Sequence, residues 1–367
     1  MRREEYIESQ KSVHGRKTAV VLPISCPKEI LTAFNVHAVE LWGPPGEARS
    51  AEVGRIQTYV CPLVRNALAF IAGGFASQAD AVLFPHTCDS IQGLASLLPD
   101  FGGWSGAVLR FTHPKGERRK SSEVYLRNEF KDFIGQLEDF TGHKLDEEKL
   151  LWAVSLHCEI DALLLELLDK RAYIDASDKE FYASVRRGEW LWPEEYFDEL
   201  KSLKERIENK PVQTGTPVML SGIVPEPMNL LDNLNESGAY VVMDDYAAIN
   251  RRVARLNKFC GGDVLDFLVE RYFSIPPCST RSSSLPERTA HVSELYEKSG
   301  AQGLILHNMT FCEPEMYDVP AIKKKFKAME APLLYMETAL EKELSGQVVT
   351  RLEAFVEMAS AKKGAVA

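Results

Sequence analysis

Short apolar runs alternate with stretches of helical spacing in the first third of the chain. Each run is bounded by Pro, Gly, Asn, Asp or His, and the runs are Ala19–Ile24, Ala38–Trp42, Ala81–Phe84 and Ala107–Phe111. Continuous runs of this length are typical of buried strands. The helical stretches include Pro27–Phe34 and Glu52–Ile71. Strands that alternate with helices predict a parallel α/β sheet.

The pattern changes in the middle of the chain and then returns. Residues 120–210 are rich in Glu, Lys, Leu and Arg, and their apolar positions recur at helical spacing, as at Leu150, Val154, Cys158, Leu163 and Leu167. The composition of Pro211–Pro217 indicates a linker. Four further strand candidates follow: Val218–Ser221, Tyr240–Met243, Leu304–Leu306 and Leu333–Met336. A last helix is expected over Gln347–Met358.

This pattern divides the chain into five parts. We predict an N-terminal segment over residues 1–17, a first α/β domain over 18–119, a helical segment over 120–212, a second α/β domain over 213–344 and a C-terminal helix over 345–367. The two α/β parts also resemble each other. The third strand of each runs into a cysteine followed by an acidic residue, in HTCD (His86–Asp89) and TFCE (Thr310–Glu313).

Composition narrows the class of protein. The 367 residues are 45% hydrophobic and 26% charged, which is ordinary for a globular protein with a real core. Lys and Arg number 43 against 53 Asp and Glu, a net charge of −10 that argues against broad nucleic-acid binding. No apolar run approaches the roughly 20 residues of a membrane helix, and the charged start does not resemble a signal peptide. We therefore expect a cytoplasmic protein without a membrane partner, whose seven cysteines form no disulfide framework.

Several common functional motifs are absent from the sequence. There is no GxxxxGK[ST], GxGxxG, HExxH, CxxC or GxSxG. These absences argue against a P-loop nucleotidase, a standard dinucleotide site, a zinc ribbon and a thioredoxin-like redox site. The dispersed cysteines remain as the candidate chemistry.

Three cysteines are placed where a ligand site is expected. Cys88 and Cys312 each lie just past the carboxyl end of a predicted strand, where open α/β sheets bind ligands. A helical stretch follows each of them, and a helix N-terminus favours a thiolate. Cys61 lies in a predicted helix that Pro62 interrupts. If the two sheets face each other across a cleft, these three thiolates suit an iron–sulfur cluster with one iron left open.

The alternative for any of these cysteines is a structural role. Free cysteine is among the most buried residue types, and spacing alone favours packing over metal binding. Cys158 lies on the apolar face of a predicted helix and is expected in the core. Cys26, Cys260 and Cys278 remain open between the two roles.

A family resemblance then bears on this choice. The combined FC-[DE]-P and TR-x-EAF-x-E elements are fairly specific, and further stretches agree in order: residues 27–43, 56–68, 79–91, 218–245, 303–324 and 346–358. Together they resemble the 2-hydroxyacyl-CoA dehydratase family, which includes the benzoyl-CoA reductase cluster subunits. The helical segment in the middle of the chain matches the family only in its general composition and helical pattern.

The resemblance implies a fold and a cofactor. It implies two Rossmann-like α/β domains with a helical insertion between them and a [4Fe–4S] cluster in the cleft. Carried over by position, the three ligands are Cys61, Cys88 and Cys312. A related double-cubane branch holds a larger cluster with more cysteines. In that case Cys26 would be the first additional ligand in this chain.

The resemblance also implies an activity. The family removes water from a 2-hydroxyacyl-CoA through a ketyl radical, or reduces an aromatic acyl-CoA in the reductase branch, in anaerobic metabolism. A separate ATP-hydrolysing iron–sulfur activator supplies the electron, and a hetero-oligomer forms with a related second cluster subunit. The implied function is thus the iron–sulfur subunit of an ATP-activated dehydratase. The alternatives are a benzoyl-CoA-type or double-cubane reductase subunit and a non-catalytic electron-transfer partner.

Other polar residues allow two interpretations. His86 and Asp89 flank Cys88 and could move protons or bind cluster sulfur, and loop packing or helix-terminal charge explains them equally well. The basic clusters Arg118–Lys120 and Lys323–Lys325 are expected to be solvated, with a CoA-phosphate or activator contact as the alternative.

Overall fold

The structure is a computed structural model that describes residues 3–42, 54, 56–72, 78–101 and 104–364. Within these residues, two four-stranded sheets are formed, and every strand pair is parallel. The first sheet contains β1 (Lys17–Val21), β2 (Val36–Glu40), β3 (Ala81–Pro85) and β4 (Ala107–Phe111). The second contains β5 (Thr216–Gly222), β6 (Ala239–Tyr246), β7 (Gly303–Met309) and β8 (Leu333–Thr338).

Both sheets have the same strand order. The first runs β2-β1-β3-β4 and the second β6-β5-β7-β8. The predicted α/β class with two Rossmann-like domains is therefore confirmed, together with the internal resemblance of the two α/β parts. In each sheet the second strand lies on one side of the first and the third strand on the other side. The order of the strands therefore reverses between β1 and β3, and between β5 and β7. Open α/β sheets bind ligands outside the carboxyl ends of strands at such a switch point.

Helices cover the sheets and join them. The longer ones are α1 (Arg3–Ser12), α2 (Lys28–Ala33), α3 (Pro62–Ala72), α4 (Asp89–Phe101), α5 (Lys120–Thr141), α6 (Glu147–Asp169), α7 (Asp178–Arg186), α8 (Pro193–Lys204), α9 (Asn229–Glu236), α10 (Val264–Phe273), α11 (Leu285–Ser299), α12 (Glu313–Ala328) and α13 (Gly346–Gly364). Short 3-10 turns are η3 (Arg171–Tyr173), η4 (Arg187–Glu189), η5 (Asn250–Arg252) and η6 (Ser279–Arg281). In the described part of the chain, none of these helices has the length and apolar character to cross a membrane.

The strands are apolar on both sides because each sheet has helices on both faces. On β1, Val20 packs in the same core as α3 and α4, as does Leu22 just after the strand, whereas Ala19 and Val21 pack in the core that contains α2 and α5. The second sheet repeats this arrangement. The alternation gives continuous apolar runs, which explains why the strands are readable in the sequence.

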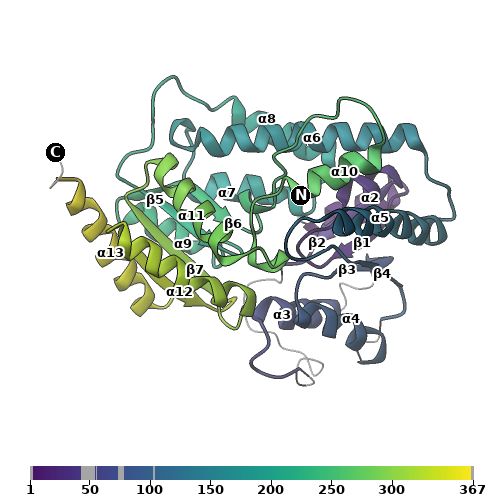
Figure 1. Cartoon of the computed structure of the whole chain (residues 1–367), viewed down its shortest axis with the longest axis horizontal. Coiled ribbons are helices and arrows are strands. Elements are labelled where there is room, and N and C mark those ends of the chain that lie inside the picture. Colours follow the sequence, from purple (N-terminus) through teal and green to yellow (C-terminus); the bar gives the residue numbers. More distant parts are fainter. Residues whose placement is uncertain (1–2, 43–53, 55, 73–77, 102–103, 365–367) are drawn as a thin grey trace.

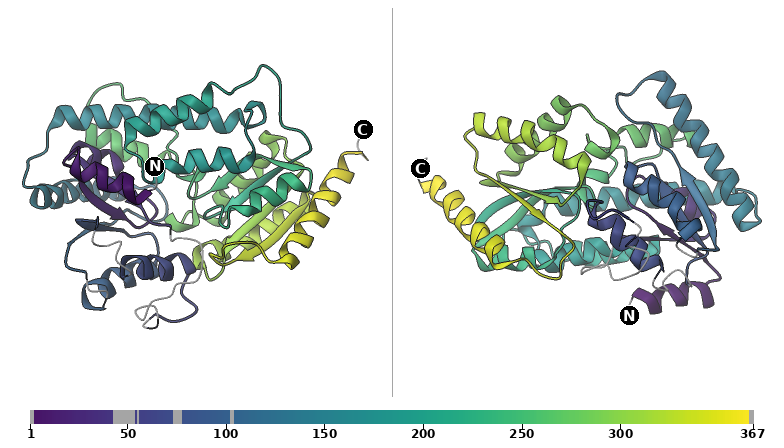
Figure 2. Two further views of the ribbon diagram at one scale, coloured as in Figure 1. Left: turned by 180° about the vertical axis from the view of Figure 1, so that it is seen from behind. Right: turned by 90° about the horizontal axis from the view of Figure 1, so that it is seen from below.

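The helical segment spans both sheets. Figures 1 and 2 show α6 and α8 running along one side of the molecule from the first sheet to the second, and α6 contacts both α2 and β6. Asp146 caps the start of α6, because its Oδ1 accepts hydrogen bonds from the backbone N–H groups of Glu148 and Lys149. The α5 helix packs on the first sheet, with Phe130 stacked on Phe111 at 5.4 Å, and α10 returns from the second half to pack on α5. The chain thus crosses between its two halves more than once.

The start of one helix differs from the expectation. The sequence predicts a helix over Glu52–Ile71, but residues 56–61 form turns and bends, and α3 begins at Pro62. Residues 52, 53 and 55 lie outside the described residues. Proline has no N–H to donate and its fixed φ suits the first turn of a helix, so Pro62 begins the helix and does not interrupt it.

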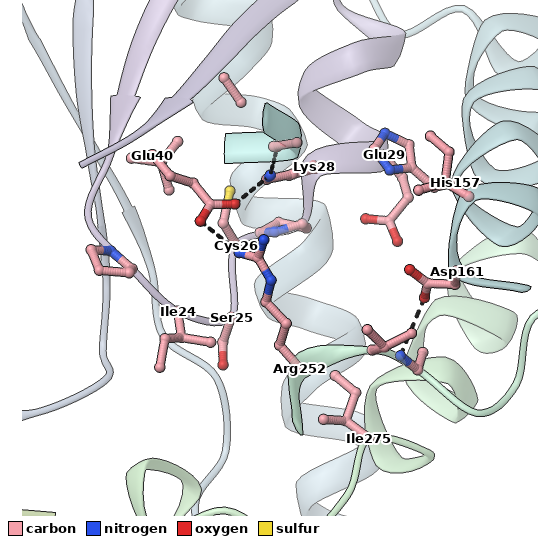
Figure 3. A pocket seen from close by; sticks show the side chains of 18 of the residues that line it. Ile24, Ser25, Cys26, Lys28, Glu29, Glu40, His157, Asp161, Arg252 and Ile275 are labelled. Atoms are coloured by element: carbon pink, nitrogen blue, oxygen red, sulfur yellow. Dashed lines mark hydrogen bonds and ion pairs between the residues drawn. The ribbon is translucent and has the colours of Figure 1, made fainter. Parts of the chain in front are cut away.

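A buried ion-pair bridge joins the two halves. Arg252 of η5 reaches Glu40 at the end of β2 with Nη1 to Oε2 at 2.5 Å, and Lys28 of α2 pairs with the same carboxylate (Figure 3). Glu40 is only 3% exposed. Burial alone would raise the pKa of Glu40, but the cations of Arg252 and Lys28 lower it to about 2. The carboxylate is therefore ionised and holds both cations in place.

A second bridge runs parallel to the first. Arg271 of α10 donates to Glu29 Oε1 of α2 at 2.9 Å and to Asp161 Oδ2 of α6 at 2.8 Å. Figure 3 places Glu29 and Asp161 on the side of the same polar region opposite Glu40. The two arginines thus connect the second half of the chain to the first sheet and to the helical segment.

We expect Glu40→Gln to reduce the free energy of unfolding by about 1–3 kcal/mol at pH 7, because Lys28 and Arg252, which are each 23% exposed, lose the buried carboxylate that pairs with both of them. The folded-state pKa of Glu40 lies below its unfolded value. Its contribution is therefore present above pH about 4.5 and declines as the pH falls towards 2. Denaturant titrations of the variant and the wild type at pH 7 and pH 4 measure both effects. Glu166→Gln, which breaks the exposed pair with Lys204, is the matched control and should change stability little. An equal loss in the two variants would contradict the bridge.

Candidate functional site

A cavity of about 940 Å³ lies between the two sheets. Its walls come from segments that follow strands of both sheets: Leu22–Ile24 after β1, Leu41 and Trp42 after β2, Thr87–Ile91 after β3, Ile223 after β5 and Phe311–Pro314 after β7. Residues of η6 and the start of α11 complete the lining. The carboxyl ends of the two sheets therefore face one shared space, as the cysteine positions required.

The three predicted cluster cysteines line this cavity together. Cys61, Cys88 and Cys312 immediately precede α3, α4 and α12 respectively, so each occupies the position just before a helix. Cys61 and Cys312 are each 8% exposed, and Cys88 is partly buried. Three helix N-termini, two from the first half and one from the second, thus direct their positive ends towards one space.

Backbone N–H groups favour the thiolate at each position. The amides of Leu63 and Val64 lower the pKa of Cys61. Burial raises the pKa of Cys88, and the amides of Ile91 and Ser90 partly offset it. Cys312 makes no capping hydrogen bond with its side chain, although the Glu315 amide still acts to lower its pKa.

The thiols also interact with one another. The Cys312 thiol donates a hydrogen bond to the Cys61 sulfur, which lowers the pKa of Cys61 and raises that of Cys312 well above its usual value. The Cys61 sulfur also raises the pKa of Cys88 by repulsion between like charges. Three thiolates this close are costly without a cation, and iron would supply the compensating charge.

The donor set fits a cluster better than a single ion. Among the described residues, no three His, Cys, Asp or Glu side chains converge as ligands of one metal ion. In a [4Fe–4S] cluster each thiolate binds a different iron, so the three sulfurs surround the cluster and need not meet at a point. Cys61, Cys88 and Cys312 line one cavity, which agrees with such a donor set.

The other four cysteines lie elsewhere. Cys26 and Cys278 line a smaller cavity of about 200 Å³, and Figure 3 shows Cys26 beside Lys28 and Glu40. Cys158 is 3% exposed and lies 3.5 Å from Arg271 Nη1, in the core as expected. Cys260 is exposed. Cys26 thus lines a different cavity from the three clustered cysteines.

The two flanking residues of Cys88 are placed differently. Asp89 lines the cavity and is exposed, whereas His86 is not among the described residues that line it. Burial and the nearby Lys115 lower the pKa of His86, which favours its neutral imidazole. Lys115 lines the cavity and donates to Thr87 O at 3.2 Å.

A buried network that the sequence did not indicate supports the site. Arg251 is fully buried, and its Nη1 lies 2.5 Å from Oε1 of Glu315 in the first turn of α12. The same Nη1 is 3.7 Å from Cys278 Sγ. Arg251 therefore fixes the turn of helix that begins at Cys312. Its partners are far apart in the chain, so no local pattern could have revealed them.

Asp318 is a second residue that the sequence did not indicate. It lies on α12, lines the cavity and is 5% exposed. Its Oδ2 accepts from Arg288 Nε at 3.2 Å. The only available signal was an acidic residue on the helix that follows Cys312.

The first basic cluster is neutralised by neighbouring acids. Arg118 pairs with Glu123 and Glu270, and Lys120 also pairs with Glu123. Arg119 pairs with Glu117. These pairs are mostly exposed, which agrees with the interpretation of a solvated face.

Comparisons with known proteins agree with the site. The family model described as 2-hydroxyglutaryl-CoA dehydratase, D-component, matches residues 23–359. Lactoyl-CoA dehydratase subunit beta of Anaerotignum propionicum is 26% identical over 361 residues, 96% of this chain and 94% of that protein. The (R)-phenyllactyl-CoA dehydratase beta subunit of Clostridium sporogenes is 24% identical, covering 96% and 95%. A benzoyl-CoA reductase subunit of Thauera aromatica is 24% identical, covering 91% and 88%. The family resemblance read from the sequence is confirmed, and the chain belongs to the 2-hydroxyglutaryl-CoA dehydratase D-component family.

Proposed function

We propose that this chain is the iron–sulfur subunit of an ATP-activated 2-hydroxyacyl-CoA dehydratase, which removes water from its substrate through a ketyl radical. The observation that supports this most directly is the placement of Cys61, Cys88 and Cys312 before three helices that face one cavity. Family membership and the dehydratase relatives agree with it.

The three cysteines would hold a [4Fe–4S] cluster. When bound, the cluster would supply a low-potential electron and an iron that can bind an oxygen ligand. The cavity volume lies near the upper end of the range of about 300–1,000 Å³ that is typical of small-molecule sites. This agrees with a space that admits part of an acyl thioester beside the cysteines.

The rest of the lining would control water. Leu22, Leu41, Trp42, Leu63 and Val64 form an apolar wall beside the cysteines. A wall of this kind lowers the local dielectric and keeps bulk water from a reactive radical. This property suits a reaction in which an electron must not escape to solvent.

Proton handling would fall to polar residues near Cys88. His86 and Asp89 are our proposals from the sequence for this role. Asp89 is the better placed of the two, because it lines the cavity. His86 would act through the loop that carries Cys88.

The proposal includes protein partners. A related second cluster subunit and an ATP-hydrolysing iron–sulfur activator would complete the enzyme. Exposed apolar side chains at the cavity lining agree with a face that a partner covers: Tyr59 is 65%, Phe311 47% and Tyr317 68% exposed. The seven free cysteines agree with a reducing, cytoplasmic location.

Three alternatives can be distinguished by experiment. A benzoyl-CoA-type reductase subunit would deliver electrons to an aromatic thioester, and the relative from Thauera aromatica keeps this open. A non-catalytic partner would bind a cluster without responding to acyl-CoA. A larger double-cubane cluster is less well supported, because Cys26 and Cys278 line the other cavity.

We expect serine substitution of Cys61, Cys88 or Cys312 to reduce bound iron by at least half from about four per chain, because each thiolate binds its own iron. Iron and acid-labile sulfide are measured after anaerobic reconstitution, with the electron paramagnetic resonance spectrum of the reduced protein. Cys260→Ser and Cys26→Ser are matched controls and should keep the full iron content. If Cys26→Ser lost the cluster while Cys88→Ser kept it, the assignment would be wrong.

We also expect the reconstituted complex with its sister subunit and activator to form an enoyl-CoA from a 2-hydroxyacyl-CoA only when ATP is supplied, because the electron needs an energy source. Product formation is followed by mass spectrometry, and the cluster spectrum is recorded with and without substrate. Turnover of benzoyl-CoA alone would indicate the reductase alternative. A cluster spectrum that no acyl-CoA alters would indicate the electron-transfer partner.

A further inference from the structure

We propose that Asp318 exchanges protons with the acyl-CoA substrate during dehydration, a role that rests on the proposed function. Dehydration needs an acid for the departing hydroxyl and a base for the proton on the β-carbon. Among the described residues that line the cavity, the acids are Asp89, Glu313 and Asp318. Asp89 and Glu313 are exposed, and Asp318 is buried.

The position of Asp318 is fixed relative to the cysteines. It lies on α12, the helix that begins directly after Cys312, about two turns along. The side chain lines the same cavity and is almost fully buried. A residue on a helix is held more rigidly than one on a loop, which suits a group that must meet one substrate atom.

Charged and polar neighbours surround Asp318 from four elements. Arg288 of α11 donates from Nε to Oδ2 at 3.2 Å, and its Nη2 donates to Asp245 and Ser221 in the core. Glu315 lies on the same helix, Arg251 comes from η5, and Ser279 from η6. Arg288 thereby links one oxygen of Asp318 to strands β5 and β6 of the second sheet.

These neighbours oppose one another in their effect on protonation. Burial raises the pKa of Asp318 and the charge of Glu315 raises it further. Arg288, Arg251 and the Ser279 hydroxyl lower it, and the result is a pKa of about 6. A carboxyl with this pKa can hold and release a proton near neutral pH, which general acid–base catalysis requires.

The proposed proton steps balance. Protonated Asp318 gives its proton to the departing hydroxyl as the bond from the α-carbon to oxygen breaks, and water leaves. The resulting carboxylate takes the proton from the β-carbon and regenerates the acid form. The single electron that the thioester accepted before these steps returns to the activated enzyme after them. The substrate therefore loses one water with no net oxidation or reduction.

A purely structural role would make Asp318 the partner of Arg288 and nothing more. A substitution of Asp318 distinguishes the two roles by its effect on cluster content and on substrate affinity. A structural residue, when lost, would disturb α12 and with it the cluster at Cys312. A proton-transferring residue would leave cluster content and substrate affinity near the wild-type values.

The test uses Asp318→Asn and Asp318→Glu in the complete reconstituted complex. We expect Asp318→Asn to keep its iron content, cluster spectrum and affinity for a 2-hydroxyacyl-CoA. Turnover should fall at least 100-fold, the low end of the range for loss of a general acid–base group. Exchange of the β-hydrogen with deuterium oxide should fall with it. Asp318→Glu should recover part of both rates, and the surface change Asp198→Asn should alter neither.

The pH dependence gives a second readout. Because the acid form acts first, wild-type turnover should fall as the pH rises through about 6, and Asp318→Asn should lack this limb. Turnover of Asp318→Asn within a few-fold of the wild type would overturn the proposal, as would equal loss of iron and turnover in both Asp318 variants. A wild-type complex that binds its cluster but forms no enoyl-CoA would refute the proposed function itself.

Discussion

The site depends on the buried arginine bridges that hold the two sheets at a fixed separation. Arg252 reaches Glu40 across 212 residues of sequence, and Arg271 reaches Glu29 across 242. Cys61 and Cys88 belong to one side of the cleft and Cys312 to the other. A change in the separation of the sheets would therefore change the separation of the three sulfurs. The main effect of the bridges is to fix this geometry. Their net contribution to stability is smaller, because the desolvation of buried charges offsets much of the attraction between them.

The candidate site has one geometric basis, which is the way that both sheets are oriented towards the cleft. Both sheets present their carboxyl ends to the cleft, so the helices that follow their strands begin there. A helix that begins at the cleft brings free N–H groups and a positive end, which favour a thiolate. The repeated strand order therefore gives two opposed sets of helix N-termini. The three cysteines lie at these helix N-termini, beside an apolar wall of the same cavity.

The sequence revealed the parts of this arrangement that depend on local pattern. The strands are continuous apolar runs because both faces of each sheet are covered, and the cysteines after β3 and β7 stand at strand ends. It failed where the structure depends on distant contacts. It could not place Cys26 in the smaller cavity, since strand-end position is the same for Cys26 as for Cys88. It also missed Asp318, whose burial depends on partners from three other elements.

We propose above that Cys61, Cys88 and Cys312 hold one cluster between the two sheets. Diffraction at the iron absorption edge, on crystals of the anaerobically reconstituted protein, locates the iron directly. We expect one group of irons in the cleft, within bonding distance of the Sγ atoms of these three residues. Iron bound instead to Cys26 or Cys278 in the smaller cavity would show that the three cysteines do not hold the cluster.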